Sequence, residues 1–99
     1  DIKIFMEAYQ WSRKAPSNFP ELSPNLGIFF SDIEADFSKP LDSYHNSEIL
    51  NDLKSWQKYS NDIFIWHYIT NFNGYLQPFP NIKSTATDLK TFNDLKNIF

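Results

Sequence analysis

The sequence predicts an α/β domain built on a parallel β-sheet. Two continuous apolar runs, Leu26–Ile33 and Ile63–Ile69, are typical of strands that are buried on both faces. Between them, the segment Glu48–Tyr59 carries apolar residues at helical spacing. A strand, a helix and a second strand in this order form a crossover, which joins parallel neighbours within one sheet.

The N-terminal segment Ile2–Tyr9 predicts a further strand, because its residues alternate with a period of two and include several β-formers. The connection Gln10–Asn25 that follows contains three prolines, which break any helical pattern. Irregular connections of this length are usually functional in compact domains.

The first helix is expected to begin after a loop, Ala35–Asn46, that contains Pro40. Ser47 is placed to cap this helix, since serine is a favoured N-cap residue. The helix should turn an apolar stripe toward the sheet, made of Ile49, Leu50, Leu53 and Trp56.

The last part of the chain predicts a long loop and a second helix. Polar and aromatic residues extend from Thr70 to Ser84, and Thr85–Asp88 then has the spacing of a capping box. The helix that it opens carries one apolar stripe, made of Leu89, Phe92 and Leu95.

The number of strands indicates a partial domain. Two or three parallel strands are too few to form a complete sheet with both faces covered. The chain also begins at Asp1 instead of Met and ends on Ile98 and Phe99 without a polar tail. We therefore expect residues 1–99 to be one piece of a longer chain, partnered by that chain's remaining strands.

Composition excludes several classes of function. Nine basic and 12 acidic side chains give a net charge of -3, which argues against a nucleic-acid module held by phosphate neutralisation. The lack of cysteine excludes disulfides, thiolate metal sites and a cysteine nucleophile. With only Gly27 and Gly74, the chain has no glycine-rich phosphate loop. We expect no cofactor, no metal and no membrane segment.

Polar and aromatic residues gather where the predicted strands end. Ligand sites of parallel α/β folds lie at the carboxyl ends of the strands. The first strand ends near Tyr9 and the second near Asp32. The full strand-end set is Glu7, Tyr9, Gln10, Trp11 and Arg13, then Asp32, Glu34 and Asp36, then Trp66, His67, Tyr68 and Asn71.

Three carboxylates, Asp32, Glu34 and Asp36, stand at alternate positions and share one face if the strand continues through them. Neighbouring carboxylates raise one another's pKa, which suits the acid and base of a glycosidase, and they can also hold Ca²⁺ or Mg²⁺. We select Glu34 and Asp32 as catalytic candidates. The alternative is a solvated strand end whose carboxylates cap backbone amides.

Aromatic and amide side chains predict a sugar site after the third strand. Trp66, Tyr68 and Tyr75 offer flat apolar faces, and Asn71 can match vicinal hydroxyls. His67 can serve as a base, a hydroxyl partner or a metal ligand, or as a hydrogen-bonded structural residue. The remaining binding candidates are Tyr9, and Arg13 for a carboxylate on the ligand.

The run of residues 65–81, IWHYITNFNGYLQPFPN, resembles a hallmark stretch of a bacterial family, domain of unknown function 4838. Looser similarities include Ala8-Tyr9-Gln10 and Pro40-Leu41. The resemblance implies a (β/α)₈ TIM-type barrel related to α-glucuronidase and hexosaminidase-type glycoside hydrolases. The chain would supply a few βα units from the second half of that barrel. In the family pattern we expect an acidic residue between the tryptophan and the tyrosine. This chain has His67 at that position and so departs from the pattern.

We therefore expect part of a glycoside hydrolase that acts on a plant or microbial glycan, with Glu34 or Asp32 supplying a carboxylate. The resemblance implies a secreted, periplasmic or cell-surface parent protein. One alternative is a non-catalytic carbohydrate-binding protein on the same barrel. The other is a structural domain, for which Trp66 and Tyr75 would be deeply buried.

Overall fold

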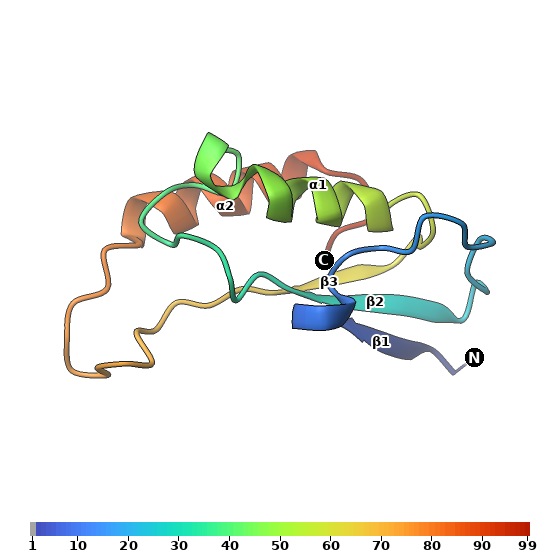
Figure 1. The fold of residues 1–99 in the computed structure, drawn as a ribbon, viewed down its shortest axis with the longest axis horizontal. Helices are drawn as coiled ribbons and strands as arrows, with labels where there is room; N and C mark the ends of the chain where they lie inside the picture. The colour runs from blue at the N-terminus through green and yellow to red at the C-terminus, as the bar shows by residue number, and fades with distance from the viewer. Residues whose placement is uncertain (1) are drawn as a thin grey trace.

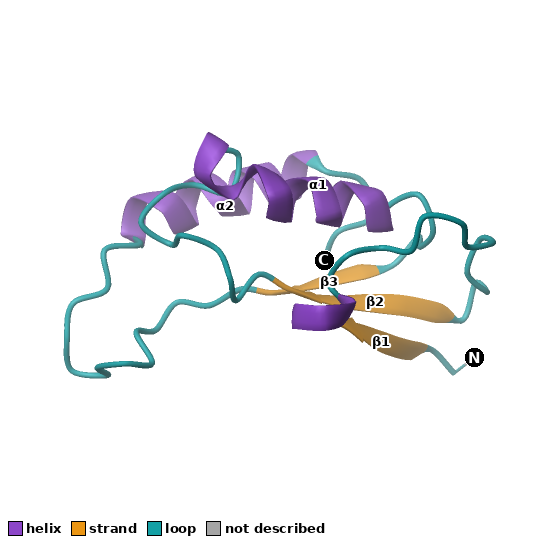
Figure 2. Cartoon of the chain, viewed as in Figure 1, coloured by secondary structure: helices purple, strands orange, loops and turns teal. Residues whose placement is uncertain are grey.

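The computed structural model describes residues 2–99, which form a mixed α/β unit. Two helices cover one face of a three-stranded sheet and leave the opposite face uncovered (Figures 1 and 2). The strands are β1 (Ile4–Ala8), β2 (Leu26–Ser31) and β3 (Ile63–Trp66), and the α-helices are α1 (Ser47–Trp56) and α2 (Ile82–Asp94). Two short 3₁₀ helices precede β2 and α1, at Gln10–Ser12 (η1) and Tyr44–Asn46 (η2).

The strands pair in the sequential order β1-β2-β3, and both pairings are parallel, as the crossover pattern predicts. A further segment runs beside β3 after α2. Ile63 N donates to Asn97 O (2.9 Å) and Phe99 N donates to Ile63 O (2.9 Å), in a parallel bridge. Helix α2 is therefore a second crossover, and residues 97–99 occupy the position next to β3.

The hydrophobic core lies between the sheet and the helices. Ile28, Phe30 and Ile63 point toward the helix layer, and Leu53 of α1 packs over them. The stripe predicted for this helix is thus the packed face. Trp56, at its end, donates from Nε1 to the carbonyl of Arg13 (2.6 Å), which ties the connection after β1 to α1.

Only one face of the sheet is buried, which corrects the expectation of strands covered on both sides. Phe5 and Phe64 lie on the uncovered face with their rings edge to face, 5.0 Å apart, and both are exposed. Phe29 of β2 lies between these two strands, half-buried on the same face.

The strands are shorter than predicted. Strand β2 ends at Ser31 instead of Ile33, because Ala35 N donates to Asp32 O (2.8 Å) and closes a turn. Strand β3 ends at Trp66 instead of Ile69, before a long loop that carries the next aromatic residues.

The helix starts also differ from the predictions. Helix α1 begins at Ser47, and the preceding Asn46 donates from Nδ2 to backbone carbonyls of the loop. Helix α2 begins three residues early, at Ile82, and Asp88 accepts from Leu41 N instead of closing a capping box. Among residues 2–99, no helix is both long and apolar enough to cross a membrane.

Candidate functional site

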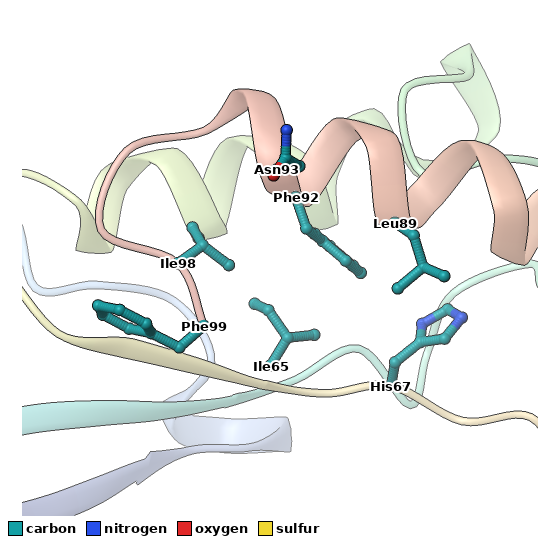
Figure 3. Close-up of a pocket in the computed structure, with 7 residues that line it drawn as sticks. All are labelled: Ile65, His67, Leu89, Phe92, Asn93, Ile98 and Phe99. Atoms are coloured by element: carbon teal, nitrogen blue, oxygen red, sulfur yellow. The ribbon is translucent and has the colours of Figure 1, made fainter.

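Strand alternation places the predicted site residues on opposite faces of the sheet. Successive side chains of an extended segment point to opposite sides. Trp66 and Tyr68 therefore lie on the uncovered face, whereas His67 lies between the sheet and α2, where its ring packs edge to face on Phe92 (Figure 3). Sequence proximity alone had grouped the three, and the fold separates them.

The uncovered face has a hollow at the carboxyl ends of the strands. Its volume is about 430 Å³, and the rings of Trp66 and Tyr68 stack within it, with centroids 5.8 Å apart and planes 10° from parallel. Trp66 is 44% exposed. We call this cavity the aromatic hollow; the residues that line it are Glu7, Tyr9, Ile33, Trp66, Tyr68 and Phe72.

The loop after β3 supports one wall of the aromatic hollow. Phe72 packs edge to face on Tyr68, with centroids 5.6 Å apart, and Tyr75 packs on Phe72 in turn. Tyr75 is 71% exposed and does not itself line the hollow. Asn71 Oδ1 accepts from Asn73 N (3.0 Å), so this amide shapes the loop and is not a lining residue.

Asp32 and His67 form a buried pair on the helix side. Asp32 is 1% exposed, and His67 Nδ1 lies 2.6 Å from its Oδ2. Because an ionised carboxylate only accepts hydrogen bonds, Nδ1 carries the proton. On the other side of the ring, His67 Nε2 is 3.9 Å from Asp88 Oδ2 of α2.

These contacts shift two pKa values upward. The hydrogen bond to Asp32 raises the pKa of His67, and it outweighs the burial that opposes the charged ring. Burial raises the pKa of Asp88, although the hydrogen bond from Leu41 N opposes that shift. Beside the pair is a cavity of about 250 Å³, lined mainly by apolar residues (Figure 3): Ile65, His67, Leu89, Phe92, Asn93, Ile98 and Phe99.

Arg13 is held by carboxylates of the protein itself. Its Nε donates to Asp52 Oδ2 (2.9 Å), Nη1 to Glu34 Oε2 (2.7 Å) and Nη2 to Glu48 Oε1 (3.2 Å). The side chain is 12% exposed. Each nitrogen of the guanidinium thus has a protein partner, and the predicted contact of Arg13 with a carboxylate on a ligand stays a prediction.

Glu34 lines a second hollow, of about 410 Å³, together with Gln10 and Trp11. Gln10 has a φ of 47°, in the left-handed region that costs a residue other than glycine about 1 kcal/mol or more. The two hollows adjoin along the chain. Tyr9 lines the aromatic hollow and Gln10 lines the second one, and Ile33 and Glu34 are divided in the same way.

The expected cluster of three carboxylates does not form. Because the strand ends at Ser31, the chain turns, and the three side chains find separate partners. Asp36 Oδ1 accepts from Ser38 N (3.0 Å) and Oγ (2.6 Å), and these hydrogen bonds lower the pKa of Asp36. Its role is to cap a turn. Within residues 2–99, no three acidic or histidine side chains are grouped to hold a metal ion.

Glu7 was placed at a strand end by the sequence but was not selected as a catalytic or binding candidate. It lies in β1, two positions before Tyr9, and the two side chains point to the same side of the sheet. The exposed side chain of Glu7 lines the aromatic hollow. The period-two pattern contained this signal, because it places both residues on one face. Asp88 was missed as well, since only the folded chain brings α2 to His67.

Comparison with known proteins gives one result. A family model described as "Domain of unknown function (DUF4838)" matches residues 1–97. The comparison with curated proteins and the comparison with solved structures each found no match. The matched region includes every residue that lines the aromatic hollow.

Proposed function

The chain belongs to the DUF4838 family, and on that premise we propose that it binds carbohydrate in the aromatic hollow, as part of a glycoside-hydrolase-like barrel. The observation that carries this proposal is Trp66, which is 44% exposed at the carboxyl end of β3 and stacks on the buried ring of Tyr68. The family description itself names no activity, so the relation to glycoside hydrolases is part of the proposal.

The arrangement of the sheet supports a (β/α)₈ barrel. Barrel strands follow one another in sequence order, with every crossover helix on the outer side. Here the order is β1-β2-β3, both helices lie on one face, and residues 97–99 take the next position (Figure 1). In a closed barrel the uncovered face, with Phe5 and Phe64, becomes the packed interior, and the aromatic hollow lies at its active-site end.

The hollow offers the chemistry that a sugar ring needs. The exposed ring of Trp66, which stacks on the buried ring of Tyr68, presents a flat apolar surface. The carboxylate of Glu7 and the hydroxyl of Tyr9 are hydrogen-bonding groups beside that surface. The exposure of Trp66 and Tyr75 disfavours a purely structural role, in which both would be buried.

Hydrolysis would require two carboxylates about 5 to 10 Å apart across the glycosidic bond. Glu7 in the aromatic hollow and Glu34 in the adjoining one are the pair that the proposal uses. Asp32 is better suited to positioning, because it is buried and bonded to His67.

A non-catalytic carbohydrate-binding protein is the second candidate. It is favoured by the contacts of the two carboxylates that the sequence had selected. Glu34 is paired with Arg13 and Asp32 with His67, so neither presents its carboxylate to the aromatic hollow.

Titration calorimetry of the complete protein against a panel of plant and microbial oligosaccharides tests the proposal. We expect one class to bind, and Trp66→Ala to weaken that binding at least tenfold, about 1.4 kcal/mol. The matched control is Tyr44→Ala, which removes an exposed aromatic side chain from η2. If no oligosaccharide binds, or if Trp66→Ala leaves the affinity unchanged, the proposal is wrong.

Measurement of released sugar separates the two candidates. Release that is lost in both Glu7→Gln and Glu34→Gln supports a hydrolase. Binding without release supports a carbohydrate-binding protein.

A further inference from the structure

We propose that the aromatic hollow selects sugars that carry an ammonium group, with the Glu7 carboxylate as the counter-charge. The inference rests on the proposed carbohydrate function and specifies the class of sugar. It follows from the charges around the hollow and from the kind of side chain that lines it.

Glu7 is the one charged residue that lines the aromatic hollow in the described part of the chain. None of the ion pairs found among residues 2–99 involves it, and no hydrogen bond there engages its carboxylate. Its backbone is held in place, since Ser12 Oγ donates to Glu7 O (2.9 Å). The carboxylate is thus available to a ligand, on a backbone that the protein positions.

The first basic residues on either side of Glu7 in the chain, Lys3 and Arg13, are already engaged. Arg13 is bound to three carboxylates, and Lys3 forms an ion pair with Asp62. His67, between Asp32 and Asp88, is on the opposite side of the sheet. Glu7 thus has no basic partner among the ion pairs found in residues 2–99, and a cationic ligand would supply one.

The other residues that line the aromatic hollow also favour a positively charged ligand. The face of an aromatic ring is electron-rich and attracts a cation that approaches within about 6 Å of its centroid. Tyr9, Trp66 and Phe72 contribute at least partly exposed rings to the hollow, whereas Tyr68 is buried and stacks on Trp66. A carboxylate with several aromatic faces is the combination that recognises ammonium groups.

The same arrangement disfavours acidic sugars. A uronic acid would bring its carboxylate beside Glu7, with no free guanidinium or ammonium group in the hollow to bind it. Neutral sugars remain acceptable, since their hydroxyls can donate to Glu7. The volume of about 430 Å³ is within the range of small-ligand sites.

The experiment compares oligomers of one length and linkage that differ in one substituent. Calorimetry of the complete protein is run with β-1,4-linked glucosamine, N-acetylglucosamine and glucose oligomers, and with an oligomer of a uronic acid. We expect the glucosamine oligomer to bind about tenfold more tightly than its N-acetylated form, and added salt to reduce the difference.

Glu7→Gln should remove the preference for the glucosamine oligomer over its N-acetylated form, because the substitution preserves shape and loses the charge. Glu21→Gln, at an exposed carboxylate outside the hollow, is the matched control and should keep the preference. Thermal melting of both variants checks that they fold.

Two results would overturn the inference and leave the proposed function in place. One is binding of neutral oligomers with no preference for the ammonium form, and the other is a preference for the uronic acid. A preference that persists in Glu7→Gln would also overturn the role of this residue. Absence of any binding would overturn both the inference and the proposed function.

Discussion

Replacing Asp32 by asparagine should lower the stability of the fold and change how that stability depends on pH. Asp32 is 1% exposed and accepts the hydrogen bond of His67 at 2.6 Å. An asparagine amide at this position can still accept the bond but without charge, so the cost is that of a charge-assisted hydrogen bond, about 2 kcal/mol. Since the pair connects the segments that follow β2 and β3, the loss is expected to appear in global unfolding.

The pH dependence follows from the direction of the His67 shift. Its pKa in the folded protein is raised above the unfolded value of about 6.5. The corresponding stability is therefore complete below pH ~6.5 and is lost as the pH rises through the folded-state pKa. The raised pKa of Asp88 also makes the fold less stable as the pH rises. This loss begins at lower pH, near the ordinary pKa of a carboxyl group.

Urea unfolding followed by tryptophan fluorescence, repeated between pH 5 and 9, measures both effects. We expect the free energy of unfolding of the original protein to fall above pH ~6.5, and Asp32→Asn to be less stable with a flatter profile there. The control is Asp36→Asn. Because the pKa of Asp36 is lowered, its contribution is lost on acidification, and the profile above pH 6 should not change. A slope in Asp32→Asn equal to that of the original protein would refute the reasoning.

Two further predictions concern packing and charge. Gly27→Ala should destabilise the sheet by about 1–3 kcal/mol in thermal unfolding, because the new methyl group would collide with the Phe5 ring and lie 3.0 Å from Asp62 O; an unchanged melting temperature would contradict this. Arg13→Met should cost about 3 kcal/mol in urea unfolding by leaving Asp52 buried without its partner, and adding Asp52→Asn should recover part of that loss. Equal stability of the single and double variants would contradict it.

The predicted elements that were confirmed depend on local pattern. The helix around Leu53 and the strand around Ile28 carry periodic apolar residues, and each was found. The residues at which the helices and strands begin and end were predicted less well. Ser47 was predicted as the cap of the first helix, but it is the first residue of α1, and Asp88 is bonded to Leu41 N, 47 residues away, instead of closing a capping box.

The candidate site was predicted in part, for the same reason. Trp66, Tyr68 and Tyr9 were selected from the sequence, and the fold brings all three to the aromatic hollow. Arg13 was selected as a ligand contact, and the fold surrounds it with three carboxylates, one from the turn after β2 and two from α1. No local pattern could identify those partners, because they are 21 to 39 residues away in the chain.

By itself, the sequence determined the fold class, the parallel pairing of the strands and the aromatic character of the strand ends. These depend on periodicity and on crossover length, which are local properties of a chain. Only the tertiary structure decided which polar side chain serves a ligand and which serves the protein. Strand alternation and the packing of α2 turned His67 inward to Asp32 and left Glu7 beside Trp66, because each side chain points where the completed sheet directs it.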